Sequence, residues 1–386
     1  MRRRQLGAAL TLMLAGPRAF AAKASSHAAV DGDDTMPGMS RVGIPGFAVA
    51  RRHADAPAIV RGYGWADVRA RRRVDADTVF HLASVSKVVT ATAVLMLWES
   101  GAFGLDDPVA PHLDFALAHP RFPATGITFR QLLTHASGIS DQRYERLRWN
   151  GPERQLPALG DFLRGYLAPG GRDFDAQACW GDSAPGAQWS YSNVGYALLG
   201  HLVQRIAGQP LDALTRERLF GPLGMASTAW SPSALPASRL ARGYAPGALA
   251  RALPPVLYPD WPAGALRSSA RDFGRLLALY CGDGTVAGRR LLEPATLAEM
   301  FRPQAVAIPD GGGEVRQAIA WTLREVDGRT LASHSGGDPG TDALACVDRA
   351  SQAGMFCVAN VTGSPALRAW QKGVVLRELD AARAQA

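Results

Sequence analysis

Ser84 and Lys87 stand three residues apart in the run Ser84-Val85-Ser86-Lys87. A serine hydroxyl becomes a strong nucleophile when a neighbour takes its proton, and a partly desolvated lysine can accept that proton. If the run opens a helix, the offset places both side chains on one face, with Ser84 at the positive end of the helix dipole. The spacing therefore predicts a nucleophile and its activator.

Lysine usage supports a special role for Lys87. Of the 42 Lys and Arg residues only three are lysines, at positions 23, 87 and 372. Arginine stays protonated in proteins, whereas lysine can release its proton, so a chain this rich in arginine keeps lysine where arginine cannot serve. The alternative, a surface cation with a buried stem, fits the apolar surroundings of Lys87 less well.

Tyr191-Ser192-Asn193 forms a second candidate element. A tyrosine near cations can carry a proton between nucleophile, leaving group and water, and an asparagine amide can contact both a lysine and a substrate carbonyl. Taken alone, Tyr191 would more often be a core or capping aromatic. Tyr191 and Asn193 are stronger evidence for a catalytic site when they occur together with the Ser84 motif.

His334-Ser335-Gly336-Gly337 forms a third element, at the end of a strand-like run. Its glycines allow a substrate to approach the backbone, and such a strand can supply an oxyanion-hole N–H. A Ser-His-Asp triad is the competing interpretation, but the chain has neither G-x-S-x-G nor an evident acid partner.

The elements that must position these residues follow from periodicity and turn residues. Residues 84–100 have helical spacing of apolar side chains and are followed by Gly101, which predicts a buried helix. Further helices are expected at 128–135, 193–207, 270–280 and about 364–384, and strands at 43–50, 58–65, 318–325, 330–334, 342–348 and 354–361.

Strands at both ends around a helical middle predict an α+β fold. We expect an antiparallel sheet built from the N- and C-terminal segments and covered by helices, with an inserted, mostly helical lobe. The single catalytic domain would span 22–386, with an α/β lobe at about 36–104 and 255–386 and a helical lobe at about 105–254. The cleft between the lobes is the expected site.

Residues 1–21 have the pattern of a secretory signal peptide. A basic start precedes an apolar run at 6–16, and Ala19 and Ala21 form a small-residue cleavage signature. Eleven residues are too few to cross a bilayer core, which needs about 20. A periplasmic or secreted location is expected, by the Sec or the twin-arginine route, and no later segment is long enough to span a membrane.

Charge and composition exclude several classes of protein. The net charge of +8 falls to +4 without the four arginines of the leader, and the basic run at 69–73 lacks interleaved aromatics, so it is interpreted as a solvated hairpin turn and not as a nucleic-acid site. The histidines lack metal-ligand spacing, so no metal or cofactor is expected. The four cysteines are either disulfide partners, with Cys346 and Cys357 as candidate neighbours, or buried thiols.

In order along the chain, S-x-x-K, Y-S-N and H-S-G resemble the motifs of the penicillin-recognising serine hydrolases, in the branch that holds class C β-lactamases, serine D,D-peptidases and β-lactamase-like esterases. The resemblance runs from about residue 39 to about residue 363. It includes the phrases GIPG at 43–46, LLTHASG at 132–138, PLGM at 222–225 and PAG at 262–264.

The resemblance implies a β-lactamase/transpeptidase-like fold and a role for each motif residue. Ser84 would be the acylated nucleophile, Lys87 its activator, Tyr191 the proton carrier and Asn193 the positioning amide. The oxyanion hole would be the backbone N–H groups of Ser84 and Gly337. Deacylation would also depend on Tyr191.

His334, Ser335 and Gly336 would line the substrate site. His334 stands where class C β-lactamases have lysine, and Asn193 follows Ser192 where they usually have alanine, which weakens a cephalosporinase assignment. Histidine there resembles D,D-peptidases, in which it would face a substrate carboxylate. We therefore expect His334 to be a hydrogen-bonding, partly cationic contact and not a triad base. His135 is expected to be structural.

The sequence thus predicts an exported serine hydrolase that acts through an acyl-enzyme on amide or ester bonds, D,D-carboxypeptidase-like or esterase-like. The substrate would be a small molecule, peptide or ester, with cell-wall peptide and β-lactam among the candidates. A class C-type β-lactamase is one alternative. An inactive penicillin-binding or cell-wall-binding protein is the other.

Overall fold

The computed structural model describes residues 36–54, 56–147, 155–255, 257–306, 308 and 315–384. The predicted signal peptide, residues 1–21, lies outside these ranges. Within them, no helix combines the length and apolar character that a membrane crossing requires.

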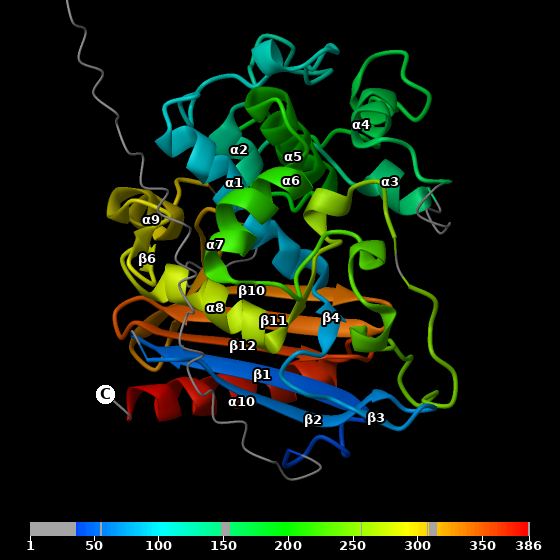
Figure 1. The fold of residues 1–386 in the computed structure, drawn as a ribbon. Coiled ribbons are helices and arrows are strands. Elements are labelled where there is room, and N and C mark those ends of the chain that lie inside the picture. Colours follow the sequence, from blue (N-terminus) through cyan, green and yellow to red (C-terminus); the bar gives the residue numbers. More distant parts are fainter. Residues whose placement is uncertain are drawn as a thin grey trace, which may run out of the picture.

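One antiparallel sheet organises the described residues (Figure 1). The N-terminal hairpin joins the C-terminal strands where β1 pairs with β12, from Phe47 opposite Ala359 to His53 opposite Ala353. The sheet from both termini, and with it the α+β class, is confirmed. In spatial order the strands are β3 (Arg72–Arg73), β2 (Ile59–Asp67), β1 (Gly46–His53), β12 (Ala353–Ala359), β11 (Thr341–Asp348), β10 (Arg329–Asp338), β9 (Thr322–Val326) and β8 (Val315–Gln317).

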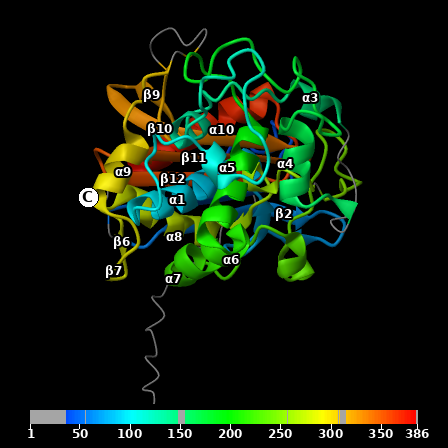
Figure 2. The same ribbon diagram turned by 90° about the horizontal axis from the view of Figure 1, so that it is seen from above.

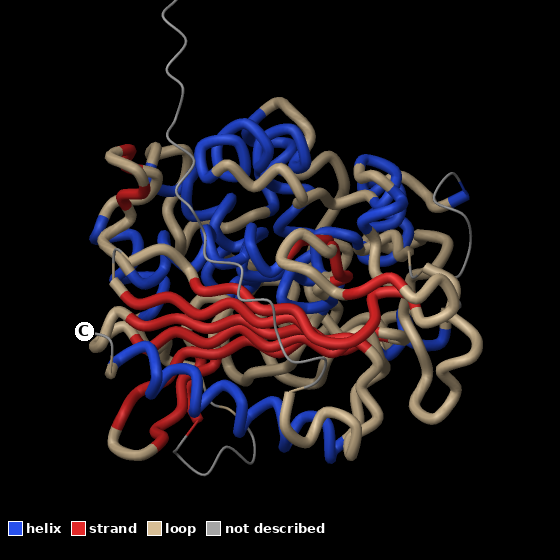
Figure 3. Tube along the Cα trace, turned by 60° about the horizontal axis from the view of Figure 1, so that its bottom comes forward, coloured by secondary structure: helices blue, strands red, loops and turns tan. Residues whose placement is uncertain are grey.

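Helices cover both faces of this sheet. Successive strand residues point to opposite faces, and in β1 Ala48 and Ala50 join the core beneath α8 (Ala270–Cys281), whereas Phe47 and Val49 join the core beneath α10 (Pro365–Arg383). Figure 3 shows α10 crossing the strands on its own side of the sheet. Two covered faces explain why the central strands are nearly uniformly apolar.

The remaining helices lie on the α8 side of the sheet, where α1 (Ser86–Glu99) and α5 (Asn193–Ala207) pack against each other (Figure 2). Almost every residue of α1 is buried, so the helix is apolar on all sides. The others are α2 (Phe129–Leu133), α3 (Gln142–Arg146), α4 (Leu159–Leu167), α6 (Leu211–Thr215), α7 (Gly221–Leu223) and α9 (Pro294–Phe301).

Short elements connect these layers. Two strand pairs stand apart from the main sheet, β4 (Val79–His81) with β5 (Arg267–Ser269) and β6 (Thr285–Val286) with β7 (Arg289–Arg290). Single 3-10 turns occur at Ala83–Val85, Ala110–His112, Pro232–Ala234, Ala237–Arg239 and Trp261–Ala263, and a π-helical turn occurs at Arg216–Phe220. β4 leads directly into the 3-10 turn that contains Ser84.

Most expected elements form close to their predicted bounds. Helix α5 spans the predicted residues and ends at Gly208, whose φ of 66° is the left-handed conformation that glycine adopts readily. The helix expected from Ser84 begins at Ser86, because Ala83 has a φ of 45° and Ser84 lies in the preceding 3-10 turn. Strand β10 continues four residues beyond His334, and β8 was not predicted. The lobe boundaries stay a prediction.

The basic run at 69–73 contains the β2–β3 turn, as predicted. Residues 69–71 are exposed, and the Arg73 guanidinium lies 3.8 Å from the ring centroid of Trp65. Stacking on an aromatic face stabilises this cation.

The four cysteines are free and buried, so the thiol interpretation holds and the disulfide alternative does not. On β11 and β12, Cys346 lies opposite Met355 and Cys357 lies opposite Leu344, so the two sulfurs are offset by two residues. Burial raises the pKa of the Cys346 thiol to about 12.

Two glycine-to-alanine substitutions in helices test the packing of α8 on the sheet. A Cβ at Gly274 would lie 2.8 Å from the Cβ of Ala58, whereas a Cβ at Gly165 in α4 has nothing nearer than 3.7 Å. We expect Gly274→Ala to lower the free energy of unfolding by about 1–3 kcal/mol through overpacking. Gly165→Ala should raise it by about 0.5–1 kcal/mol through helix propensity. Chemical denaturation measures both, and equal effects would contradict the close approach of α8.

Candidate active site

Ser84 lies in a tightly anchored turn between β4 and α1. The Leu82 N–H donates to the Leu266 carbonyl at 2.9 Å, and the Ser86 hydroxyl donates to the Ala83 carbonyl at 2.6 Å. The same Ser86 oxygen accepts the Leu266 N–H at 3.0 Å. These bonds hold the Ser84 hydroxyl in place at the start of α1.

Lys87 is fully buried and meets three oxygen acceptors. Its Nζ donates to Ser84 Oγ at 3.2 Å, to Asn193 Oδ1 at 2.7 Å and to the Ala263 carbonyl at 2.7 Å, and it lies 4.8 Å from the ring centroid of Tyr191. A buried charge requires such partners. The surface-cation alternative is therefore wrong, and the structure joins Ser84, Lys87 and Asn193 as the motif predicted.

Asp141 fixes the first turn of α5, which carries Asn193. Its carboxylate accepts the Asn193 N–H at 2.6 Å, the Val194 N–H at 3.2 Å and the Ser192 hydroxyl at 2.8 Å. Ser192 Oγ in turn accepts the Gly195 N–H at 2.9 Å as the N-cap. Burial raises the pKa of Asp141, and these hydrogen bonds oppose the rise. Sequence analysis missed this residue, whose one signal is its position soon after the LLTHASG phrase.

His135 supports the loop that carries Tyr191. Its carbonyl accepts the Ser190 N–H at 2.7 Å, its Nδ1 accepts the Ser192 N–H at 3.2 Å, and the rings of His135 and Tyr191 lie 4.4 Å apart. An accepting Nδ1 places the ring proton on Nε2. Burial, aided by the charge of Lys87, lowers the pKa of His135 well below its usual value. The ring is neutral and structural, as expected.

Gly336 allows β10 to lie directly against the Ser84 turn. A Cβ at this position would lie 2.3 Å from the Leu82 carbonyl oxygen and 2.9 Å from the Ser84 nitrogen, so only glycine permits the contact. Pairing of β9 with β10 ends at Ser333, so residues 334–338 have no strand partner on that side within the described ranges. The backbones of Ser84 and Gly337, the predicted oxyanion hole, thus come together beside an open strand edge.

His334 is neutral in this arrangement. Its Nδ1 lies 2.8 Å from the Ser335 carbonyl, which can only accept, so Nδ1 donates and Nε2 faces the site as an acceptor. Burial and the charge of Lys87 lower the pKa of His334 to about 3. At neutral pH His334 therefore offers a hydrogen-bonding contact without positive charge, and its contact with a substrate carboxylate stays a prediction.

These residues surround a cavity of about 300 Å³ in front of Ser84. Two of its walls, Trp189 and Gln317, were not predicted, and Trp189 Nε1 donates to Gln317 Oε1 at 2.9 Å. No lysine or arginine side chain is among the described residues that line it. Those residues are Ser84, His135, Trp189, Tyr191, Gln317, Ala320, Thr322, His334, Ser335 and Gly337. Across the described ranges, no three His, Cys, Asp or Glu side chains cluster as metal ligands.

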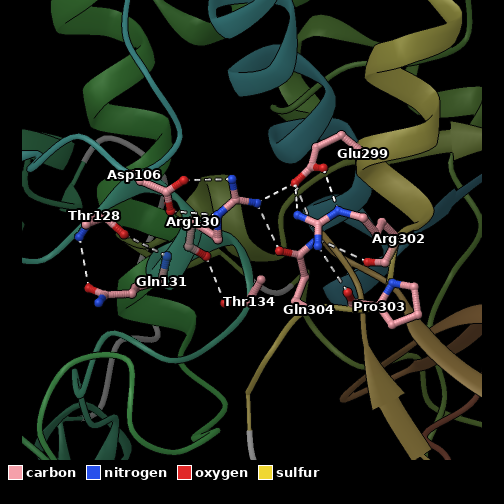
Figure 4. A network of polar contacts seen from close by, with 9 residues as sticks. All are labelled: Asp106, Thr128, Arg130, Gln131, Thr134, Glu299, Arg302, Pro303 and Gln304. Carbon is pink, nitrogen blue, oxygen red and sulfur yellow. Dashed lines mark hydrogen bonds and ion pairs between the residues drawn. The ribbon is translucent and has the colours of Figure 1, made fainter.

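A network of polar contacts is centred on Arg130 (Figure 4). Arg130 on α2 binds Asp106 through two N–H groups at 2.7 and 2.9 Å, contacts Glu299 on α9, and donates to Gln304 Oε1 at 3.0 Å. The Gln304 N–H then donates to the Gln317 carbonyl at 2.8 Å. Helix α2 leads into His135, which lines one side of the cavity. The network therefore connects that side with the side formed by Gln317.

One buried carboxyl group, Asp260, and one partly buried carboxyl group, Asp338, lie beyond Gly337. Asp338 Oδ1 accepts the Tyr258 hydroxyl at 3.4 Å, and Asp260 Oδ1 accepts the Tyr144 hydroxyl at 2.6 Å. Burial and the charge of Asp260 raise the pKa of Asp338 to about 7, and burial raises the pKa of Asp260 to about 6. Asp338 therefore gains its charge close to neutral pH.

Comparison with known proteins agrees with this geometry. The model of the β-lactamase family matches residues 33–376. The chain belongs to the β-lactamase family. Members named penicillin-binding protein and esterase are among its relatives, which supports a serine hydrolase of the penicillin-recognising superfamily.

Three relatives illustrate the range of the family. Penicillin-binding protein 4 of Amycolatopsis lactamdurans is 32% identical over 69% of this chain and 68% of its own length. Esterase EstB of Burkholderia gladioli is 34% identical over 54% of this chain and 53% of its own length. The octameric penicillin-binding protein homologue from Pyrococcus abyssi is similar in fold, with a TM-score of 0.69 at 23% identity over 87% of this chain and 75% of its own.

Substitution of Asp141 tests its role as a positioning residue. Asp141→Ala leaves three donors at the start of α5 without an acceptor, so we expect a loss of about 1–3 kcal/mol in stability and slower acylation of Ser84. Asp141→Asn keeps one oxygen acceptor and should recover part of both. Thermal unfolding and the rate of labelling by a fluorophosphonate probe measure the two effects. Labelling of folded Asp141→Ala at the wild-type rate would contradict the role.

The raised pKa of Asp338 predicts a pH-dependent effect on stability. The unfolded chain ionises this carboxyl near pH 4 and the folded chain near pH 7, so its contribution to stability falls as the pH rises between these values. Asp338→Asn cannot ionise. Its Tm should equal the wild-type Tm near pH 4 and exceed it by about 5 °C near pH 7.5. A Tm difference that is constant across this range would show that Asp338 is not held in its neutral form.

Proposed function

We propose that the protein hydrolyses esters or amides with an uncharged leaving group, through an acyl-enzyme on Ser84. The contacts of Lys87 with Ser84 Oγ and Asn193 Oδ1 support a working nucleophile. They argue against the alternative of a protein that only binds penicillin or cell wall, because such a protein needs no buried lysine at the serine. Export to the periplasm or beyond is a further proposal, and it rests on residues 1–21.

In this mechanism Lys87, in its neutral form, takes the proton of Ser84 Oγ as the oxygen attacks the substrate carbonyl. The backbone N–H groups of Ser84 and Gly337 hold the developing oxyanion, and Asn193 helps to orient the substrate. The carbon–leaving group bond breaks as the leaving group receives a proton by way of Tyr191. Water then attacks the acyl-enzyme, gives its proton to the same relay, and releases the acid and Ser84.

The neutrality of the cavity is the observation that carries the choice of leaving group. Substrates of D,D-carboxypeptidases and β-lactamases bear a carboxylate, which needs a cation or several N–H donors. Here the described lining has no lysine or arginine, His135 and His334 are both neutral, and His334 Nε2 is an acceptor. A carboxylate facing Nε2 would meet a lone pair. The esterase among the relatives agrees with this choice.

A D,D-carboxypeptidase-like or β-lactamase-like activity is the second candidate. The open edge of β10 at residues 334–338 favours it, because an extended peptide can pair with such an edge. A bound carboxylate could also draw a proton onto His334. This candidate requires an electrostatic change on binding, whereas hydrolysis of an uncharged ester requires none.

A matched pair of chromogenic esters tests the proposal. For 4-nitrophenyl butyrate and 3-carboxy-4-nitrophenyl butyrate, each corrected for its rate of alkaline hydrolysis, we expect kcat/KM to be about tenfold lower for the carboxylated ester near pH 8, since tenfold corresponds to the loss of one modest contact. His334→Lys places a cation at the same position and should reverse the preference. Ser84→Ala should abolish turnover of both esters.

Two results would contradict the proposal. Equal or better use of the carboxylated ester by the wild-type protein would favour the carboxypeptidase-like candidate. Absence of turnover for both esters, together with no covalent labelling of Ser84 by a fluorescent penicillin, would favour the binding protein.

A further inference from the structure

A second cavity, of about 330 Å³, lies behind the chain segment 257–265 and shares no described lining residue with the cavity in front of Ser84. It is enclosed by four parts of the chain: the start of α4, the α6 region with the π-helical turn, residues 228–234, and the segment 257–265. Its described lining residues are Leu156, Pro157, Ala158, Leu159, Asp212, Arg216, Phe220, Thr228, Ala229, Trp230, Ser231, Ala234, Leu257, Tyr258, Pro259, Trp261 and Ala265.

The interior of this cavity is aromatic and apolar. Trp230 and Trp261 meet edge to face with ring centroids 5.3 Å apart, and Phe220 and Tyr258 add two further rings. Trp230 Nε1 donates to Thr215 Oγ1 at 3.0 Å, so its one polar atom is already satisfied. The charged lining residues, Arg216 and Asp212, are exposed and therefore lie at the rim. Such a cavity favours a ring or chain without charge.

The wall at Arg216–Phe220 is the one π-helical turn within the described residues. The π-helix is rare, and single π-helical turns within α-helices occur frequently at functional sites. Arg216 and Phe220, its first and last residues, both line the cavity. The irregular turn is thus located at the wall of the cavity and not at a distant part of the fold.

The segment 257–265 contacts both this cavity and the active site. On the active-site side, the Ala263 carbonyl accepts from Lys87 and the Tyr258 hydroxyl donates to Asp338, the neighbour of Gly337. On the other side, Tyr258 and Trp261 line the second cavity. The Tyr258–Asp338 bond is long, at 3.4 Å, so it restrains Tyr258 only weakly.

We propose that this second cavity binds an uncharged aromatic ring or short aliphatic chain, and that its occupancy changes catalysis by way of Tyr258 and Ala263. The catalytic consequence rests on the proposed hydrolase function, whereas the binding does not. Its volume is at the lower end of the range for small-molecule pockets, which fits one ring with a short chain. The occupant is either the acyl chain of a substrate or a separate small molecule, and both present the same apolar chemistry.

Direct binding tests the cavity independently of catalysis. Calorimetric titration with 4-phenyl-1-butanol should detect one site in the wild-type protein and in Ser84→Ala. Ala229→Leu adds apolar atoms to the cavity lining and should weaken binding at least about tenfold. Ala226→Leu, at an exposed position three residues earlier that does not line the cavity, is the matched control and should bind normally. Equal binding by Ala229→Leu and Ala226→Leu, or no binding by the wild-type protein, would overturn the proposal.

Hydrolysis of 4-nitrophenyl acetate and octanoate then identifies the source of the occupant. If the acyl chain of the substrate enters the second cavity, Ala229→Leu should lower kcat/KM for the octanoate ester and leave kcat/KM for the acetate ester unchanged. If a separate molecule binds, 4-phenyl-1-butanol changes kcat for acetate in the wild-type protein and has no effect in Ala229→Leu. If 4-phenyl-1-butanol binds but the hydrolysis of neither ester changes, the proposed link between the cavity and catalysis is overturned. Absence of all ester hydrolysis would contradict the proposed function and leave the calorimetric result standing.

Discussion

Burial of the Lys87 amino group is the constraint on which the site depends. An unpartnered charge in a protein interior is strongly destabilising, so the fold must bring three oxygen acceptors to one point. Ser84 comes from the turn before α1, Asn193 from the first residue of α5, and Ala263 from a 3-10 turn more than 170 residues away. The packing of α1 against α5 and the path of residues 257–265 are both required by this one side chain.

The backbone supplies the second requirement, a close approach between β10 and the Ser84 turn. Gly336 removes the side chain that would collide with Leu82 and Ser84, and pairing of β10 with β11 holds the strand at that distance. The same strand then exposes residues 334–338 beyond the end of β9. The close approach of the predicted nucleophile and oxyanion donors, and the free strand edge beside them, therefore depend on the position of β10 in the sheet.

Electrostatics divides the site into two environments. In front of Ser84, the cation-free lining and the neutral His135 and His334 leave Lys87 as the nearest positive charge. Beyond Gly337, the raised pKa values of Asp260 and Asp338 reduce the negative charge near Lys87 at mildly acidic pH. The segment 257–265 carries Asp260 and contacts Asp338 through Tyr258. The same segment also lines the second cavity, so the two carboxyl groups and that cavity share one part of the chain.

The sequence by itself determined the motif residues, the sheet from both termini and helices such as α5, because these depend on local periodicity, caps and motif order. It did not determine the neutrality of His334, the three bonds of Asp141, the wall formed by Trp189 and Gln317, or the free state of Cys346 and Cys357. Those properties arise from desolvation and from contacts between segments far apart in the sequence, such as Trp189 with Gln317, which are 128 positions apart. Tertiary packing decided them, because burial and register are set only when distant segments meet.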